Sequence, residues 1–426
     1  MSPKTNSSQT VAVIGGGVAG IVSAYLLQRR YHVTLFEKDD YLGGHTHTIE
    51  ISNGPDRGLA VDTGFIVLND KTYPLFEKFL SELGVATRTS EMSFGFQCRK
   101  SGLVYAGNNL NGLFTQRQNL VNPKFICFLR DIVRFCRIAR KDLASGAVSG
   151  RTLDQYLANN RVSQYMVENY LLPMGAAIWS TPAAQIGGFP AEPFLRFFQN
   201  HGLLSLRNRP QWKTVVGGSH AYVKAFRKNF QGQVLLNGQV NGIRRQAERV
   251  SVEIADGSDL SFDHVVVATH ADQALQILKD PSPLERQLLG PWRYQKNQTV
   301  LHTDATFLPA QKRAWAAWNF TRDTTTDANQ PVFVTYYMNR LQGLRAEQDY
   351  CVTLNHPNPF NPDTVVAEME YHHPLYSFDS MATQARLPEL NGRRRTYFCG
   401  SYFGYGFHED AVRSAVGVAK MFGLGI

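Results

Sequence analysis

The chain has 426 residues, of which 43% are hydrophobic and 12% aromatic, so it can bury a large interior and suits about two domains. This composition excludes a disordered or low-complexity chain. The 44 Lys and Arg against 35 Asp and Glu leave a net charge of +9, which favours an anionic ligand, nucleic acid or an anionic lipid surface without choosing among them.

Cysteine usage and hydropathy point to the cytoplasm. The five cysteines are scattered, odd in number and form no CxxC pair, which predicts reduced thiols rather than a disulfide framework. The N-terminal residues MSPKTNSSQT lack the apolar segment of a signal peptide, and no run of about 18 apolar residues predicts a spanning helix. We expect a cytoplasmic protein and leave peripheral membrane attachment open.

The first forty residues predict a βαβ unit. A β-branched run from Val11 to Ile14 is followed by a Gly-rich turn, then by a helical pattern from Ile21 to Leu27, then by a second apolar strand from Val33 to Phe36. Within the turn, Gly15, Gly17 and Gly20 complete GxGxxG.

Each glycine of this motif has a physical role. Gly15 permits the tight turn, Gly17 lets the backbone approach a pyrophosphate, and Gly20 lets helix and strand pack closely. The helix N-terminus offers N–H groups and a positive dipole end to phosphates. Glu37, at the end of the second strand, is placed to accept hydrogen bonds from a ribose diol and disfavours a 2′-phosphate. The unit therefore predicts FAD or NAD rather than NADP.

Three later stretches favour FAD. The segment LGGHTHT after Glu37 is more than a nicotinamide-binding unit needs, and VDTGF at 61–65 places an acid and a glycine after an apolar position. The strand from Tyr397 to Cys399 leads through a second Gly-rich turn into a last helix that begins near Phe407 or His408. A cofactor contacted from both ends of the chain fits the long extended form of FAD.

His45 and His47 have a metal-ligand spacing, but no nearby cluster of His, Cys or acids supplies further ligands. We therefore predict no metal site. The segment is better explained as a loop over the FAD pyrophosphate and ribityl chain, with His45 facing the cofactor and His47 pointing the other way if the backbone is extended.

These segments resemble the flavin amine oxidase superfamily. LGGHTHT looks like its LGGRxxT segment, VVGGSHAYVKAF (residues 215–226) like its GG-containing helix entry, and FDHVVVATHADQAL like the closing strand that ends in an Ala-Thr pair. The resemblance implies an α/β fold: a Rossmann-type, glutathione-reductase-like FAD-binding domain with an inserted α+β substrate domain.

The resemblance also implies non-covalent FAD and a set of contact residues. Val240 would contact the adenine through its backbone, and the N-terminus of the last helix would lie near the flavin N1–C2=O edge, where a helix dipole stabilises negative charge. The predicted cofactor residues are Gly15, Gly17, Val18, Ala19, Gly20, Glu37, Lys38, Gly43, Gly44, His45, Thr46, Thr48, Thr63, Gly64, Phe65, Val240, Ala268, Thr269, Gly400, Ser401, His408 and Glu409.

The chain departs from the superfamily pattern at three points. His45 stands where relatives usually have Arg, and Ser401 stands where they usually have an acid. Amine oxidases keep a Lys that holds a water at flavin N5, and the aligned position here is Gln298, with Lys296 two residues away on the same side of a strand. These departures count against amine oxidation.

The predicted FAD-binding domain comprises residues 1–66, 215–285 and 385–426, and the substrate domain comprises residues 67–214 and 286–384.

Within the first insert, residues 123–144 predict a helix with a basic stripe of Arg130, Arg134, Arg137 and Lys141 opposite apolar residues. Such a helix is a candidate for lying on an anionic bilayer, although a domain helix with a basic polar face has the same pattern.

Over nearly its whole length the chain is similar to a bacterial branch of FAD-dependent oxidoreductases encoded beside cyclopropane-fatty-acid-synthase-like methyltransferases. That branch includes the desaturase of furan fatty acid synthesis. The resemblance implies hydride transfer from an unsaturated or methyl-branched acyl chain of a phospholipid, in a desaturase or double-bond isomerase. Peripheral attachment to the inner face of the bacterial membrane is left open. A peroxide-releasing amine oxidase and a non-catalytic flavoprotein that binds lipid or a methyltransferase remain alternatives.

The chemistry requires at most one base near a dry apolar slot. The candidates are His408, His45 and Glu409, with Tyr402 or Tyr405 orienting the substrate, and each could instead serve only the flavin or the fold. We expect no nucleic-acid partner because no DNA or RNA module is recognisable. A methyltransferase partner and a homodimer remain open.

Overall fold

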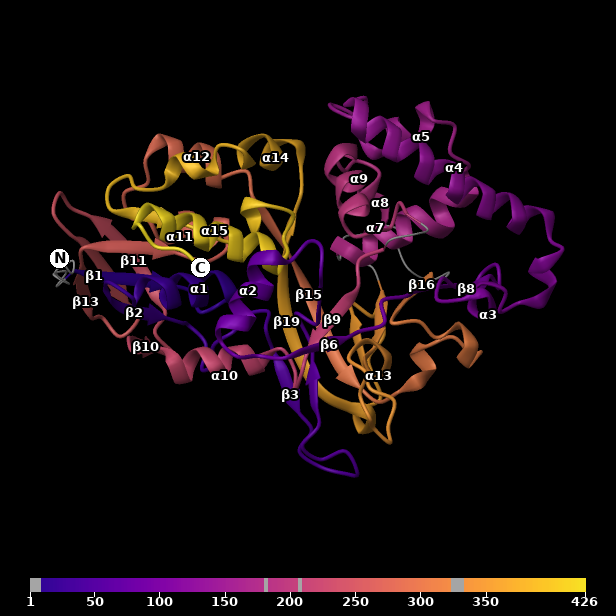
Figure 1. The fold of residues 1–426 in the computed structure, drawn as a ribbon, viewed down its shortest axis with the longest axis horizontal. Coiled ribbons are helices and arrows are strands. Elements are labelled where there is room, and N and C mark those ends of the chain that lie inside the picture. The colour runs from indigo at the N-terminus through magenta and orange to yellow at the C-terminus, as the bar shows by residue number, and fades with distance from the viewer. Residues whose placement is uncertain (1–8, 180–182, 206–208, 323–332) are drawn as a thin grey trace.

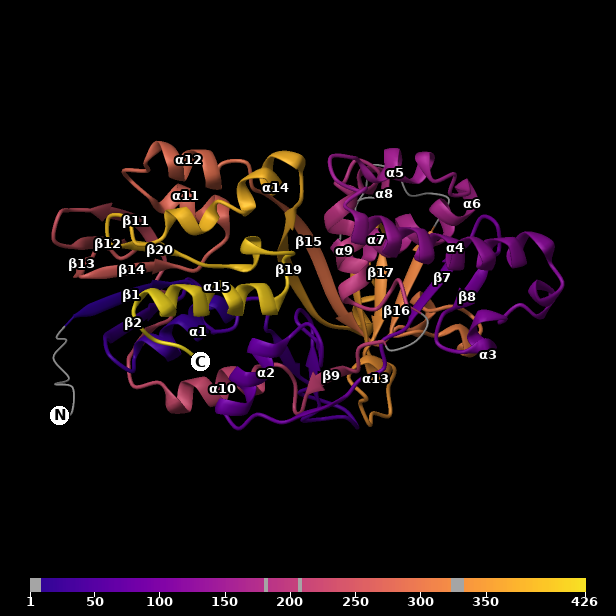
Figure 2. The same ribbon diagram turned by 45° about the horizontal axis from the view of Figure 1, so that its top comes forward.

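The structure, a computed structural model, describes residues 9–179, 183–205, 209–322 and 333–426. Two lobes lie side by side, and the long strands β15 (Arg293–His302) and β19 (Val365–Leu375) run between them (Figures 1 and 2). Within the described ranges, no helix is both long and apolar enough to cross a membrane.

The first lobe is built on a five-stranded parallel sheet in the order β10-β2-β1-β14-β20. β1 is central because its residues, such as Val13, are apolar on both faces and fully buried. The predicted βαβ unit is β1, α1 and β2. The strands are β1 (Thr10–Ile14), β2 (His32–Phe36), β10 (Gln233–Leu235), β14 (His264–Val267) and β20 (Thr396–Phe398).

Helices α1 (Val18–Leu27) and α15 (His408–Met421) pack against each other on this sheet, so the first and last helices of the chain share one core. Phe76 and Phe79 of α2 (Pro74–Glu82) belong to the same core. This helix therefore packs with the nucleotide-binding layer, although it lies within the insert predicted to begin at residue 67. The lobe's other helices are α10 (His220–Asn229), α11 (Ala271–Ile277), α12 (Pro283–Leu289) and α14 (Phe378–Gln384).

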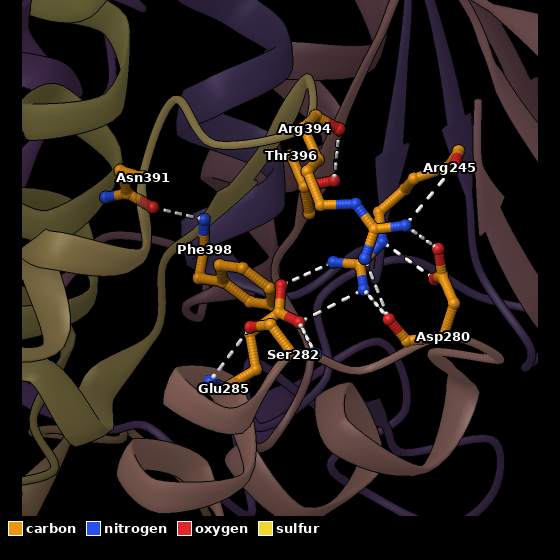
Figure 3. A network of polar contacts seen from close by, with 8 residues as sticks. All are labelled: Arg245, Asp280, Ser282, Glu285, Asn391, Arg394, Thr396 and Phe398. Atoms are coloured by element: carbon orange, nitrogen blue, oxygen red, sulfur yellow. Dashed lines mark hydrogen bonds and ion pairs between the residues drawn. The ribbon is translucent and has the colours of Figure 1, made fainter. Parts of the chain in front are cut away.

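A small antiparallel sheet of β11 (Val240–Arg245), β12 (Val250–Ile254) and β13 (Asp259–Phe262) completes this lobe. Arg245 is the last residue of β11, and its side chain is fully buried. The guanidinium donates to both carboxylate oxygens of Glu285 and, at 2.9 Å, to the carboxylate of Asp280 (Figure 3). Arg394 also bonds Asp280. This ion cluster holds β11, α12 and the segment before β20 together.

The second lobe is a seven-stranded sheet in the order β19-β15-β18-β17-β16-β7-β8, with helices packed on one face. Its shorter strands are β7 (Phe94–Cys98), β8 (Val104–Ala106), β16 (Trp318–Arg322), β17 (Val334–Tyr337) and β18 (Cys351–Leu354). Its helices are α3 (Leu110–Leu113), α4 (Pro123–Ser145), α5 (Leu153–Asn159), α6 (Gln164–Met166), α7 (Leu172–Trp179), α8 (Ala183–Ile186), α9 (Ala191–Asn200) and α13 (Met338–Leu341).

Short strands connect the lobes near the GG segment. β3 (Thr48–Glu50) pairs with β4 (Ala60–Asp62), and β9 (Trp212–Val215) pairs with β5 (Val67–Asn69) and β6 (Thr87–Thr89). The second lobe thus meets the first lobe at the loop that carries His45 and Thr46. The α/β architecture with an inserted α+β region is the one that the sequence predicted.

Candidate flavin site

The Gly-rich turn after β1 has the geometry that a pyrophosphate requires. Gly15 has φ +102°, which disfavours any side chain, and a Cβ on Gly20 would lie 1.8 Å from the Gly15 carbonyl oxygen. A Cβ on Gly17 would meet nothing within 4 Å. Gly17 therefore borders open space at the N-terminus of α1, where a phosphate would find free N–H groups.

The GG segment lies directly over this turn. Gly43 N–H donates to the Gly16 carbonyl at 2.9 Å, and Gly17 and Gly43 form a β-bridge. Gly43 and Gly44 both have positive φ, at +132° and +57°, which lets the loop double back toward His45. The Gly-rich turn and the GG segment, which are 43 − 17 = 26 residues apart at this bridge, so lie side by side.

Glu37 follows β2 and lies against the Gly-rich turn. Its carboxylate accepts hydrogen bonds from the Gly16 N–H at 2.7 Å and the Asp39 N–H at 3.0 Å, and burial raises its pKa. Each oxygen keeps a further lone pair for a ribose hydroxyl. Lys38, also predicted to contact the cofactor, is exposed and faces Asp39.

A band of partly exposed residues interrupts an otherwise buried core around the turn and the GG segment. Buried residues such as Ile14, Val18 and Ile66 flank it. The members of the band are Gly15, Gly17, Gly44, His45, Gly64, Phe65, Ala268, Thr269, Ser401 and His408. All ten were predicted as cofactor residues, and they come from the start, middle and end of the chain.

His45 lies in a cluster of uncharged rings. Its ring centroid is 5.4 Å from that of His373 on β19, 5.2 Å from Tyr371 and 6.0 Å from His270, which follows β14. Burial lowers the pKa of His45 to about 4 and those of His270 and His373 to about 3, so all three are neutral at pH 7. The Nε2 of His45 is buried and has no protein partner.

His408, the first residue of α15, lies on the other side of the GG segment. Its ring stacks on Phe65 with centroids 3.6 Å apart, and its Nε2 is 2.9 Å from the Thr46 hydroxyl. The Tyr222 hydroxyl is 2.5 Å from the same Thr46 oxygen. His408 is therefore held by the loop and by α10, and burial lowers its pKa well below the usual range.

Asp62 of the VDTG segment is a structural node rather than a cofactor ligand. Its fully buried carboxylate accepts from the Thr48 hydroxyl at 2.5 Å, the Ser219 N–H at 2.8 Å and the Gln342 amide at 2.9 Å. Thr48, which was predicted to contact FAD, instead donates its hydroxyl hydrogen bond to Asp62. The neighbouring Thr63 donates to the His47 carbonyl, and its hydroxyl is 2.8 Å from the Tyr371 hydroxyl. These bonds fix the loop between the two lobes.

Glu409 is not placed as a base, contrary to the prediction. Its carboxylate accepts from the Leu75 and Phe76 N–H groups at 3.2 and 2.9 Å, so it caps the N-terminus of α2. The next residue, Asp410, caps its own helix by accepting from the Tyr405 and Phe407 N–H groups. Both carboxylates therefore accept hydrogen bonds at helix N-termini, Glu409 at α2 and Asp410 at α15.

Tyr402 and Tyr405 do not form an aromatic pair. Tyr402 is buried against Trp292, with centroids 5.7 Å apart, and its hydroxyl has no protein partner. Tyr405 instead lines a cavity of about 360 Å³ between α9 and α14, at the seam between the lobes. The two tyrosine side chains therefore lie in different environments, one in the core and one at a cavity.

Gln298, which aligns with the flavin lysine of amine oxidases, lies on β15 together with Lys296. Lys296 and Gln298 lie on the same side of β15, as predicted, but that side is exposed, and Lys296 pairs with Glu370. The buried side presents Asn297, whose amide donates to His373 at 3.1 Å. The buried sides of β15 and β19 thus present an amide and an imidazole here and not an ammonium.

His45 and His47 do not share a site. The Nδ1 of His47 is 3.0 Å from the Tyr371 hydroxyl, and its ring stacks on Tyr41. In the part of the chain that the structure describes, no group of three or more His, Cys, Asp or Glu side chains is arranged to hold a metal.

The parallel sheet, the GxGxxG turn and the partly exposed band that includes His45 define a dinucleotide-binding oxidoreductase. The chain belongs to the family of flavin containing amine oxidoreductases, whose model matches residues 18–420. FAD is its cofactor. The residues present fit this group, with open space for a pyrophosphate at Gly17 and spare acceptor capacity for a ribose on Glu37.

Curated relatives include L-amino-acid oxidases. That of Siganus canaliculatus is 26% identical over 302 residues, covering 66% of this chain and 53% of the relative, and that of Mus musculus is 27% identical over 305 residues, covering 67% and 45%. The chain spans about half the length of these relatives.

Solved structures show the same fold at low identity. A CLA-producing fatty acid isomerase from P. acnes has a TM-score of 0.68 at 15% identity, covering 97% of this chain and 99% of that one. A variant of putrescine oxidase has a TM-score of 0.71 at 14% identity, covering 97% and 98%. The fold thus accommodates both kinds of protein.

Sequence reasoning missed several residues of the site. Tyr222 lies within the GG-containing helix entry and His270 directly follows the Ala-Thr pair, so both were adjacent to recognised motifs. The tandem His372-His373 was a visible signal in the sequence. Its significance depended on which strand faces the GG segment, which the sequence does not state.

Proposed function

We propose that this protein is an FAD-dependent oxidoreductase that acts on an unsaturated or methyl-branched fatty acyl chain, as a desaturase or a double-bond isomerase. Bound FAD supplies the acceptor for a hydride from an allylic carbon. A proton leaves the adjacent carbon and a C=C bond forms between the two, so the chain becomes a diene. An isomerase would return the hydride at another position of the same chain.

The observation that carries this proposal is the uncharged lining opposite the GG segment. Asn297, Tyr371 and His373 face His45, and Lys296 lies on the exposed side of β15 in an ion pair. An uncharged lining suits a substrate whose reacting carbon belongs to a hydrocarbon. It offers no cation for a carboxylate beside the reacting carbon.

His45 is the best candidate for the proton acceptor. Its imidazole is neutral at pH 7, and its Nε2 has no protein partner, whereas the Nε2 of His408 is bonded to Thr46. Removing a proton from carbon needs a ring nitrogen with a free lone pair, and the unpartnered Nε2 of His45 can offer one.

The cavity between α9 and α14 supports an acyl substrate. Its walls include Pro190, Pro193, Phe378 and Met381, with Tyr405 nearest in sequence to the N-terminus of α15. Arg151, Glu192 and Arg196 also line the cavity, so an alkyl chain would lie against the apolar part of its wall. Arg151 at the same cavity could meet a carboxylate or phosphate at the end of that chain.

Oxidation of an amine or amino acid with release of peroxide is a second candidate. The names of the curated relatives favour it, since they are L-amino-acid oxidases. The positions of Lys296, Tyr402 and Tyr405 count against it, because neither an inner lysine nor an aromatic pair is present where that chemistry was expected.

One experiment separates these activities. The holoprotein is mixed without oxygen with unsaturated phospholipid, with free fatty acid, or with a panel of amines and amino acids, while the visible absorbance of the flavin is followed. Bleaching by lipid or fatty acid alone supports the proposal, and analysis of the acyl product separates desaturation from isomerisation. Bleaching only by amines or amino acids supports the second candidate, and no bleaching supports a binding protein.

A matched pair of variants tests the proton acceptor. His45→Gln removes the basic nitrogen, so bleaching by lipid should slow at least about a hundredfold, the lower range for loss of a general base. His47→Gln serves as the control, because His47 already contacts the Tyr371 hydroxyl. Equal rates in the two variants, both with full FAD content, would rule out His45 as the base.

A further inference from the structure

Exposed apolar side chains gather in one short segment of the second lobe. Among the described residues, eleven large hydrophobic side chains are exposed, and five of them fall within residues 110–133. These five are Leu110, Leu120, Val121, Ile126 and Val133. Val121 and Leu110 are the most exposed of all, at 81% and 74%. A concentration of this kind marks an interaction site rather than ordinary surface.

The segment occupies one end of the molecule. α3 and the start of α4 lie at the end of the second lobe that is farthest from the nucleotide-binding sheet, in both views (Figures 1 and 2). The short helix η1 (Arg117–Leu120) connects them. We call residues 107–141 the basic tip.

The basic tip carries most of the net charge of the chain. Its 35 residues include seven basic side chains and one acid, Asp131, which gives 7 − 1 = +6 of the total of +9. The basic residues are Arg117, Lys124, Arg130, Arg134, Arg137, Arg140 and Lys141. Asp131 pairs with Arg134 at 3.7 Å, and within the described ranges Arg130, Arg137 and Lys141 have no ion partner.

Charge and apolar surface alternate on one face of α4. Ile126, Arg130, Val133 and Arg137 are exposed at successive spacings of four, three and four, so they share the outer side of the helix. The opposite side, with Phe125, Phe128 and Phe135, is buried in the core of the lobe. The outer face is thus not needed for folding.

An anionic bilayer fits this combination better than other partners do. Aliphatic side chains enter the interfacial region while Arg and Lys extend to lipid phosphates. Nucleic acid would use the cations but gains little from exposed leucine and valine. We propose that the basic tip docks the protein on an anionic lipid bilayer, with Leu120 and Val121 entering the interface and Arg130 and Arg137 contacting phosphates.

Binding to lipid can be measured without turnover, so this proposal stands or falls separately from the proposed reaction. The holoprotein is sedimented with vesicles of phosphatidylcholine, and with vesicles of phosphatidylcholine mixed with phosphatidylglycerol. We expect co-sedimentation with the anionic vesicles that weakens as salt is added. No co-sedimentation with either vesicle would overturn the proposal.

Two double variants test the two components. Leu120→Glu with Val121→Glu removes the apolar anchor, and Arg130→Glu with Arg137→Glu reverses two cations. Each should weaken binding to anionic vesicles at least about tenfold. The control is Arg227→Glu with Lys228→Glu on α10, an exposed pair on the other lobe with the same charge change.

FAD content and the thermal midpoint of each variant confirm that it is folded. An equal loss of binding in the α10 control would overturn the proposal, because net charge alone would then explain the binding. So would tighter binding of the wild type to duplex DNA than to vesicles, or loss of a dimer in the Leu120→Glu, Val121→Glu variant without loss of vesicle binding. Those results would assign the tip to nucleic acid or to a second copy of the chain.

Discussion

His408 and Glu409 are adjacent in the sequence, yet their side chains have different partners. His408 stacks on Phe65 and contacts Thr46 of the loop after the GG segment, while Glu409 accepts hydrogen bonds from the first N–H groups of α2. Successive residues on a helix point about 100° apart, so one can face the site while the next faces a neighbouring helix. Proximity in sequence to a flavin motif therefore does not identify a base.

The capping role of Glu409 leads to a specific prediction. Glu409→Gln keeps an acceptor oxygen but removes the charge at the N-terminus of α2, so stability should fall by roughly 1 kcal/mol. Turnover and flavin reduction should stay within about threefold of the wild type, since no proton transfer depends on this carboxylate. Thermal midpoint and flavin reduction rate measure the two effects. A loss of a hundredfold or more in reduction with an unchanged midpoint would restore Glu409 as a candidate base.

At the scale of elements, the Gly-rich turn separates packing from cofactor binding. Gly20→Ala would force a methyl group to 1.8 Å from the Gly15 carbonyl oxygen, whereas Gly17→Ala would place one in open space. We expect Gly20→Ala to fold poorly. Gly17→Ala should keep the stability of the FAD-free protein within about 1 kcal/mol but lose most of its FAD, because the methyl group occupies the approach of the pyrophosphate.

Flavin-to-protein ratio and the thermal midpoint of the FAD-free proteins distinguish the two variants. Full FAD content in Gly17→Ala would mean that the pyrophosphate does not approach the backbone at this glycine. The comparison is sharp because both substitutions are chemically identical and lie three residues apart.

The ion cluster around Arg245 is the second element-scale case. It joins β11, α12 and the segment before β20 (Figure 3). Arg245→Ala would leave Glu285 buried without its cation, and we expect a loss of about 3–5 kcal/mol. Arg394→Ala is the control, because its side chain is 43% exposed and should cost about 1 kcal/mol or less. Denaturant unfolding measures both, and equal losses would contradict a special role for the buried pair.

At the scale of the whole molecule, neutral histidines where the lobes meet predict acid sensitivity. Burial lowers the pKa of His45 to about 4 and those of His270 and His373 to about 3. Their unfolded forms take up protons below about pH 6.5. Between these values the unfolded state binds more protons, so stability is fully present above about pH 6.5 and falls as pH decreases, by up to roughly 1.4 kcal/mol per pH unit for each imidazole.

Asp62 acts in the opposite sense, because burial raises its pKa to about 7 and protonation favours its folded form. Burial also raises the pKa values of Glu37, Glu409 and Asp410, and it lowers those of His201, His302 and His408. The imidazoles with lowered pKa values outnumber the carboxyls with raised ones, so we expect a net loss of stability in acid. Thermal midpoints measured at about pH 7.5 and about pH 5 should show this loss, and His373→Gln should show a smaller one. An identical pH dependence in this variant would mean that His373 is already protonated in the folded protein.

The sequence by itself determined the nucleotide-binding unit, the cofactor and the family. Gly15, Gly17 and Gly20 are dictated by local backbone geometry, and local requirements leave a fixed spacing in the chain. The tertiary structure decided the rest. The cluster of His45, His270 and His373 joins three distant segments, Glu409 caps a helix that begins at residue 74, and Lys296 lies on the exposed side of its strand. Strand register and helix packing fix which way a side chain faces, and both depend on contacts between residues far apart in sequence.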